Sequence, residues 1–148
     1  MPADLRTTPR PEERIVPLVS VFSRCSSHPF PLKVLQSRAQ RLLAHELPAA
    51  APVFIVLCGN RFIRTLNNKY RKKDRPTDVL SFNFNDPDLL GEIYISLEKA
   101  RSQAREYGIS LKQEVWRLAT HGLFHLLGYT HHKKRDRVIM QRKEACYH

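Results

Sequence analysis

Residues 120–131 read Thr-His-Gly-Leu-Phe-His-Leu-Leu-Gly-Tyr-Thr-His. His121 and His125 are four residues apart, so on a helix both imidazoles lie on the same face. Most other positions from 118 to 127 are apolar, which predicts a helix that is buried nearly all round. Gly128 can take the left-handed conformation that ends a helix, and this turn would bring His131 toward the same point. The stretch therefore predicts a long helix, residues 111–127, followed by a turn that gathers three histidines.

Three converging imidazoles are typical of a metal site. Zinc binds imidazole nitrogen at about 2.0–2.1 Å, and three protein ligands leave a fourth position for water or substrate, as in catalytic sites. If no metal were bound, each buried and unpaired imidazole would cost on the order of 1–3 kcal/mol. We therefore predict one zinc ion per chain, with His121, His125 and His131 as its ligands. The next histidine, His132, is interpreted as a neighbour of the site and not as a ligand.

Glu114 lies seven residues before His121, on roughly the same face of the predicted helix. It could hold a histidine ligand in place through a hydrogen bond. The alternative is that Glu114 is exposed or ion-paired. Zinc peptidases use the same histidine spacing but place Glu directly after the first histidine as general base, and here that position is Gly122. The sequence thus argues against a peptidase.

The rest of the chain alternates strand-like and helical patterns. Strands are expected at residues 18–22, 53–57, 78–84 and 91–96. Between them, Asn60 is predicted to cap a helix that Pro76 stops, and Ser96 is predicted to cap a helix over residues 97–107 that Gly108 closes. The expected fold is α/β (α+β), a single mixed sheet flanked by helices. Residues 1–14 are expected to form a flexible N-terminal tail, and residues 15–148 a single metal-dependent hydrolase domain.

Composition narrows the class of partner. The chain has 148 residues and 25 Lys+Arg against 14 Asp+Glu, a formal net charge of +11. Such an excess favours nucleic acid or another polyanion as the partner. The apolar runs are far shorter than the roughly 20 residues of a membrane-spanning helix. The three widely spaced cysteines favour a reducing compartment. We expect a cytoplasmic protein that has no membrane partner.

A second group of residues is basic and follows the predicted helix after Asn60. Residues 61–75 contain seven Lys and Arg but only one acid, Asp74, and include Tyr70. Arginine forks match phosphate oxygens, and aromatic rings can stack on unpaired bases, so this mixture suits single-stranded nucleic acid. A solvated helix face is the alternative explanation of such a charge run. The residues expected to bind substrate are Tyr70, Arg71, Lys72, Lys73 and Arg75.

The histidine stretch, together with a second block of sequence, resembles the YbeY family of metal-dependent endoribonucleases. The second block comprises Leu-Asn at 66–67, Tyr-Arg at 70–71, Asp74, the run Pro-Thr-Asp-Val-Leu-Ser-Phe at 76–82, and Gly-Glu-Ile at 91–93. The resemblance implies a mixed four-stranded sheet, zinc bound by the same three histidines, and Arg71 and His121 as catalytic residues. The chain also departs from the family in places: Thr130 stands where the family usually has Asp, and the segment after His131 is basic.

By this resemblance the protein would cleave single-stranded RNA in ribosomal RNA processing, at the 3′ end of the small-subunit RNA, and act in ribosome quality control. Its partners would be ribosomal RNA and the ribosome or ribosomal proteins, and DNA would not be a substrate. Whether water or the RNA 2′-hydroxyl attacks is left open. Two alternatives remain at this point: a zinc hydrolase of another, peptidase-like class, and a non-catalytic ribosome- or RNA-binding factor with a structural metal.

Overall fold

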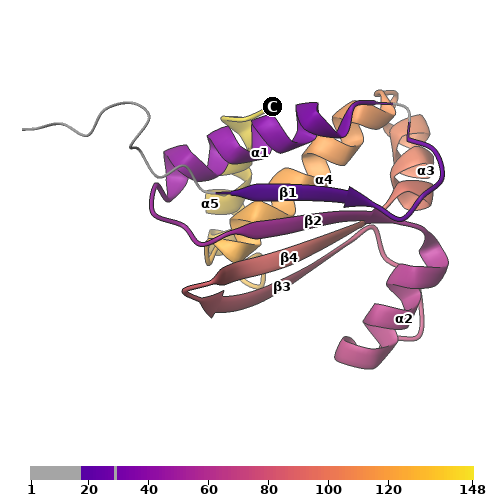
Figure 1. Cartoon of the computed structure of the whole chain (residues 1–148), viewed down its shortest axis with the longest axis horizontal. Coiled ribbons are helices and arrows are strands. Elements are labelled where there is room, and N and C mark those ends of the chain that lie inside the picture. The colour runs from indigo at the N-terminus through magenta and orange to yellow at the C-terminus, as the bar shows by residue number, and fades with distance from the viewer. Residues whose placement is uncertain (1–17, 29) are drawn as a thin grey trace, which may run out of the picture.

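The computed structural model describes residues 18–28 and 30–148, so the predicted tail of residues 1–14 lies outside the described residues. This part of the chain forms four strands and five helices (Figure 1). In order they are β1 (Val19–Ser23), α1 (Leu32–Glu46), β2 (Val53–Cys58), α2 (Asn60–Arg71), β3 (Val79–Asp86), β4 (Leu89–Ser96), α3 (Leu97–Tyr107), α4 (Leu111–Leu126) and α5 (Lys134–Ala145).

The strands form one mixed sheet in the order β1-β2-β4-β3. β1 pairs with β2 and β2 with β4 in parallel, which requires long crossover connections: α1 lies between β1 and β2, and α2 and β3 lie between β2 and β4. β3 and β4 form an antiparallel hairpin that turns at Pro87 and Asp88. The predicted fold, a mixed four-stranded sheet flanked by helices, is confirmed.

The main core lies between one face of the sheet and the helices α1 and α4. Ile55 and Ile93 point from neighbouring strands into this core and are fully buried, as are Leu118 and Leu123 of α4. α4 packs against both β3 and β4. This packing fixes the helix that carries two of the three histidines to the edge of the sheet.

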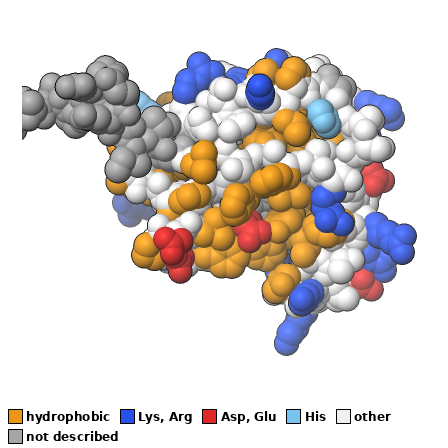
Figure 2. Space-filling model, viewed as in Figure 1, with side chains coloured by type: hydrophobic (Ala, Val, Ile, Leu, Met, Phe, Trp, Pro, Cys, Tyr) orange, Lys and Arg blue, Asp and Glu red, His pale blue; other side chains and the backbone are white. Residues whose placement is uncertain are grey.

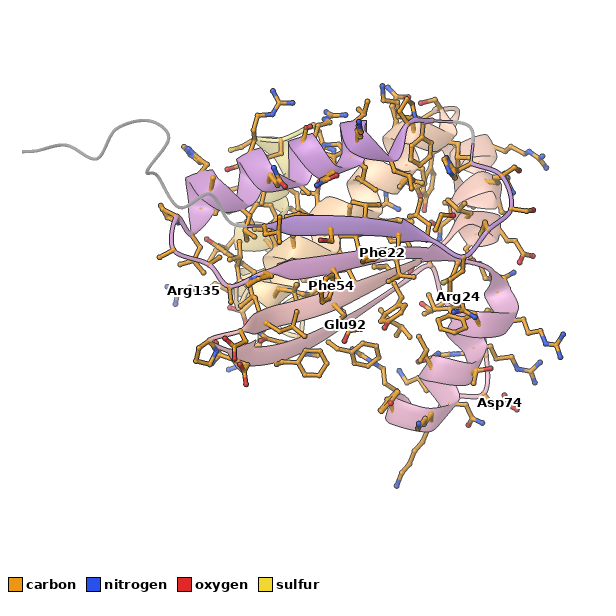
Figure 3. The ribbon with its side chains drawn as sticks, viewed as in Figure 1. Phe22, Arg24, Phe54, Asp74, Glu92 and Arg135 are labelled. Atoms are coloured by element: carbon orange, nitrogen blue, oxygen red, sulfur yellow. The ribbon has the colours of Figure 1, made fainter. Side chains whose placement is uncertain are left out.

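The opposite face of the sheet is only partly covered. Successive strand residues point to opposite faces, and α2 packs Ile63 over Cys58 and Leu80 on this second face. Beyond α2 the face is open: Phe22 and Phe54 lie near Glu92 on adjacent strands (Figure 3), and apolar side chains gather there on the surface (Figure 2). Phe22 is 53% exposed.

Helix boundaries follow the predicted capping residues in most places. The Ser96 hydroxyl accepts a hydrogen bond from the Lys99 amide, and Gly108 closes α3 in the left-handed conformation, as predicted. Two details differ around α2. Gly59 occupies the N-cap position, while the Asn60 side chain accepts a hydrogen bond from the Ser96 hydroxyl at 2.7 Å. α2 also ends before Pro76, because Lys72 already adopts a left-handed conformation with φ 56°.

No helix in the described part of the chain combines the length and apolarity that a membrane crossing needs. Cys25, Cys58 and Cys146 are all free thiols.

Candidate metal centre and active site

The first two histidines lie on α4, a helix whose start is fixed by a capping box. Ser110 and Gln113 form a reciprocal capping box at its start, which satisfies two backbone N–H groups that otherwise lack partners. After Leu126 the chain turns at Gly128, whose φ of 96° favours glycine. The Tyr129 amide donates to the Phe124 carbonyl at 3.0 Å, which folds the chain back over the end of the helix. His131 thereby reaches the two histidines of α4, as the sequence predicts.

The nitrogens of the three rings lie in one cluster. Nε2 of His125 is 3.1 Å from Nε2 of His121 and 3.1 Å from Nδ1 of His131. One ligand atom from each histidine lies within 4.8 Å of the others, so the group could hold a metal ion. Two nitrogens bound to one tetrahedral zinc at about 2.0–2.1 Å stand roughly 3.3–3.4 Å apart, close to the spacings found here.

Hydrogen bonding among the rings is a poor alternative to a shared cation. Nδ1 of His121 lies 2.8 Å from the Glu144 carboxylate. If it donates there, Nε2 of His121 carries a lone pair. In a neutral imidazole each nitrogen is either a donor or an acceptor. Nε2 of His125 therefore cannot form good hydrogen bonds with both His121 and His131. The donor set of three imidazole nitrogens therefore fits a metal of the zinc type, which prefers nitrogen and sulfur ligands.

The electrostatics of the cluster favour the neutral, ligating form. Burial lowers the pKa of His125 to about 4, with the neighbouring His121 and His131 as further causes. Burial is also the main cause of a lowered pKa at His131. Because a metal binds the unprotonated ring, these shifts keep His125 and His131 ready to ligate in mildly acidic solution.

Glu144, on α5, holds His121 in place. Its side chain is only 15% exposed and accepts from Nδ1, which aims Nε2 at the other two histidines. The sequence suggests Glu114 for such a role or, as the alternative, for an ion pair. The structure shows the ion pair: Glu114 is fully buried and contacts Arg117, with Nε to Oε1 at 2.5 Å. The contact with Glu144 spans 23 residues, and no local pattern in the sequence points to it.

The cluster opens into a cavity of about 530 Å³, the metal cavity. His121, His125, His131 and His132 line one side of it, and His132 stacks on His131 with ring centroids 5.4 Å apart. The last residue of α2, Arg71, and residues of the segment after α2 and of β3 also line it: Lys73, Thr77, Asp78, Val79, Ser81 and Asn83. Two segments that are far apart in the sequence, the histidine turn and the basic segment, thus form one site.

Arg71 is anchored at the border of this cavity. Its guanidinium donates to the Ser81 carbonyl at 3.0 Å and lies 5.7 Å from the centre of the Phe82 ring. Both contacts hold the charge beside the metal cavity while leaving guanidinium N–H groups to bind an anion.

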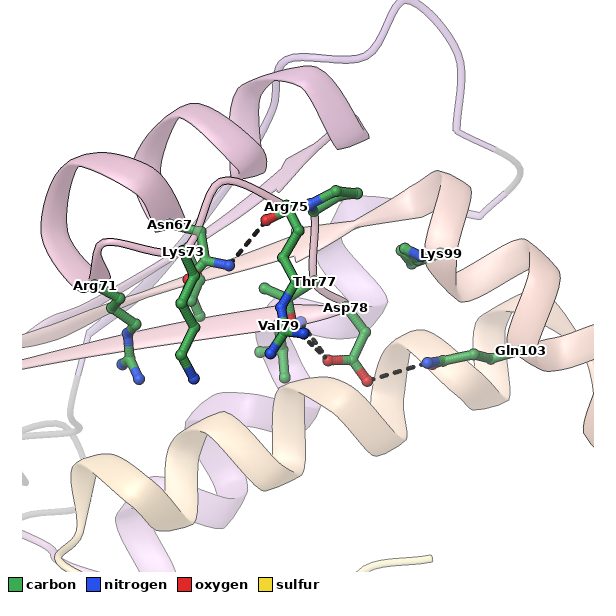
Figure 4. Close-up of a pocket in the computed structure, with 11 residues that line it drawn as sticks. Asn67, Arg71, Lys73, Arg75, Thr77, Asp78, Val79, Lys99 and Gln103 are labelled. Carbon is green, nitrogen blue, oxygen red and sulfur yellow. Dashed lines mark hydrogen bonds between the residues drawn. The ribbon is translucent and has the colours of Figure 1, made fainter.

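A second cavity of about 430 Å³, the flanking cavity, continues from the first between the segment after α2 and helix α3 (Figure 4). Arg71 and Lys73 line both cavities, and Arg75 lines the second. Two of the expected substrate-binding residues, Lys72 and Tyr70, are exposed but line neither of these two cavities. Tyr70 instead packs edge-on against Phe82.

Comparisons with known proteins agree with this geometry. The family model described as Endoribonuclease YbeY matches residues 24–147. A Carboxydothermus hydrogenoformans protein named Endoribonuclease YbeY is 46% identical over 73% of this chain and 78% of its own length. The chain belongs to the endoribonuclease YbeY family. A Pelotomaculum thermopropionicum relative of the same name is 42% identical over 75% of this chain and 80% of its own.

The chain is also similar to a solved structure. The solution structure of a Thermotoga maritima protein superposes with a TM-score of 0.67 at 27% identity, covering 88% of this chain and 86% of the other. The YbeY match spans both segments that form the metal cavity, the basic segment and the histidine turn. The resemblance expected from the motifs is thereby confirmed.

The structure gives a steric reason why this YbeY family member lacks the peptidase glutamate. Gly122 packs directly on the sheet, and a Cβ atom there would lie 2.8 Å from Ile93 Cγ2 and 2.9 Å from Ser81 Oγ. A larger side chain at this position would have to displace Ile93 or Ser81. The close packing of α4 against β3 and β4 thus favours glycine at the position where zinc peptidases have their general base.

Proposed function

We propose that this protein is a zinc-dependent endoribonuclease that cleaves single-stranded RNA. The observation that carries the proposal is the joining of three histidines and an anchored arginine in one cavity. Membership of the endoribonuclease YbeY family supports RNA as the substrate. The basic wall of Arg71 and Lys73 beside the histidines supports an anionic substrate.

In this proposal His121, His125 and His131 hold the ion, and Glu144 fixes the tautomer of His121 by keeping the proton on Nδ1. A zinc ion held there would polarise a phosphate oxygen and lower the pKa of water toward about 7. Arg71 binds a phosphate oxygen and stabilises the negative charge that develops on it in the transition state. The hydrogen bond of Arg71 to the Ser81 carbonyl suits this role, because a cation that is already held at the site needs less rearrangement during the reaction.

We further propose the biological setting that the family suggests. The RNA is ribosomal, with processing at the 3′ end of the small-subunit RNA and a part in ribosome quality control. The partners are the ribosome or ribosomal proteins, and the compartment is the cytoplasm. Residues 15–148 act as one metal-dependent hydrolase domain, with Tyr70, Lys72, Lys73 and Arg75 contributing to RNA binding.

The proposal is tested by offering the purified protein single-stranded RNA, single-stranded DNA of the same sequence, and a peptide. RNA cleavage alone is expected, and Arg71→Ala should lower its rate by about 100- to 1,000-fold, as loss of a transition-state cation does. Arg105→Ala, which removes an exposed arginine on α3 outside both cavities, is the matched control and should cleave at the wild-type rate.

Two outcomes would favour the alternatives. Cleavage of the peptide but not of RNA would indicate a hydrolase of another class. RNA that is bound by the zinc-loaded protein and stays intact would indicate a non-catalytic RNA-binding factor.

A further inference from the structure

The flanking cavity is a pocket in its own right. Its volume of about 430 Å³ falls within the roughly 300–1,000 Å³ of pockets that bind small ligands. In Figure 4 the side chain of Arg71, at the end of α2, runs beside those of Lys73 and Arg75 in the segment that follows. Lys99 and Gln103 come from α3 on the other side. Lys99 lies outside the basic residues 61–75, and only the fold brings it beside their side chains.

The charge of the pocket is strongly positive. Four cations line it, Arg71, Lys73, Arg75 and Lys99, against one acid, Asp78, so the lining has a formal charge of +3. Asp78 is itself engaged: its carboxylate accepts from the Val79 amide at 2.8 Å, the Thr77 hydroxyl at 3.3 Å and the Gln103 amide at 3.2 Å. The carboxylate therefore serves as a structural support of the cavity floor, and the cations are left to bind an anion.

The two cavities form one continuous path. They share Arg71, Lys73, Thr77, Asp78 and Val79, so the metal cavity and the flanking cavity border each other along this segment. A polymer with one phosphate per nucleotide that places a phosphate at the histidines would place a neighbouring phosphate among the cations of the flanking cavity. A single isolated phosphate would leave this second pocket unused.

We propose that the flanking cavity binds the phosphate of a nucleotide next to the scissile one, with Lys99 and Arg75 as its dedicated contacts. This inference rests on the proposed function, since it assumes an RNA chain at the histidines. It implies that affinity rises when a single-stranded RNA is long enough to reach beyond the metal cavity into the flanking cavity. Gln103 supports the site by holding Asp78 in place, and it is a positioning residue.

The test measures binding of the zinc-loaded full chain to single-stranded 2′-O-methyl oligonucleotides of increasing length, by fluorescence anisotropy at several salt concentrations. Lys99→Gln removes the charge but keeps a side chain of similar reach. Loss of one phosphate contact on a single strand should lower the slope of log affinity against log salt by about 0.7. For each tenfold decrease in salt concentration, the affinity of the variant should therefore rise by a factor roughly fivefold smaller than that of the wild type.

Lys112→Gln is the matched control, because Lys112 is exposed at the start of α4 and lines neither cavity. The expected result is that Lys99→Gln gains less affinity than the wild type from the added nucleotide, with the lower salt slope, and binds the shortest oligonucleotides like the wild type. Lys112→Gln should behave like the wild type in both respects. Equal losses in the two variants, or no loss in Lys99→Gln, would overturn the proposal.

The measurement reports binding, so it stays separate from the proposed function. A wild type that shows the length-dependent gain but cuts no RNA would contradict the nuclease and leave the flanking site standing. If the wild type cuts RNA and Lys99→Gln leaves oligonucleotide binding unchanged, the nuclease stands and the flanking site is contradicted. Stronger binding of an acidic peptide than of RNA at this pocket would also overturn the assignment to a nucleotide phosphate.

Discussion

Removing the carboxylate of Glu144 should weaken metal binding without unfolding the protein. Its oxygen lies 2.8 Å from Nδ1 of His121, and its side chain is largely buried, so the contact is shielded from water. Loss of a carboxylate that orients a histidine ligand costs roughly 10- to 100-fold in metal affinity. That range corresponds to about 1.4–2.8 kcal/mol. Glu144→Ala should show this loss, and Glu144→Gln a smaller one, because the amide oxygen can still accept the hydrogen bond.

The measurement is a competition titration of zinc between each variant and a chromophoric chelator, with circular dichroism to confirm the helix content. Alanine is well tolerated near the end of α5, so the fold should persist. Glu106→Ala is the control, because Glu106 is an exposed carboxylate on α3 away from the histidines. Zinc affinity that is unchanged in a folded Glu144→Ala would refute the assigned role of Glu144.

Three further predictions concern packing, protonation and thiol reactivity. Gly122→Ala should lower the free energy of unfolding in urea by about 1–3 kcal/mol, because the added methyl group overlaps Ile93 and overpacks the contact between α4 and the sheet; unchanged stability would contradict this packing. The pKa of His125 in the folded protein is about 4, against an ordinary value of 6.5, so the unfolded chain binds more protons between these pH values. The free energy of unfolding of the metal-free protein should therefore decrease as pH falls from 6.5 to about 4. His125→Ala should weaken this pH dependence, and urea unfolding at pH 7 and pH 5 measures the difference. Burial raises the pKa of the Cys58 thiol to about 12, so mass spectrometry should find Cys146 alkylated in the native protein and Cys58 only after unfolding; early labelling of Cys58 would count against its burial.

The parts of the structure that sequence could predict are those with local causes. Ser96 and Gly108 mark both ends of α3, and the run from His121 to Gly128 contains its own helix spacing and its own turn. The clustering of the three histidines could be predicted for the same reason, because their geometry depends on a single helix and the few residues that follow it. The position of Lys72 in the left-handed region, which ends α2 early, left no such signal.

The parts that sequence could not predict depend on contacts between distant segments. Glu144 reaches His121 only because α5 packs against α4, and Lys99 joins the basic wall only because α3 lies opposite the segment after α2. Glu114 shows the converse. Its spacing on the helix suggested a place near His121, but the side chain is buried with Arg117 as its partner. Helical periodicity gives the direction of a side chain, and tertiary packing decides which group meets it.

The central claim is that one metal ion, held by the three histidines, is required for RNA cleavage. The most direct test determines the metal content of the protein by mass spectrometry alongside cleavage of single-stranded RNA, before and after chelation and after zinc is restored. The account predicts about one ion per chain, loss of cleavage on chelation and recovery with zinc, and neither metal nor cleavage in folded His125→Ala. Full RNA cleavage by the metal-free protein or by His125→Ala would contradict it.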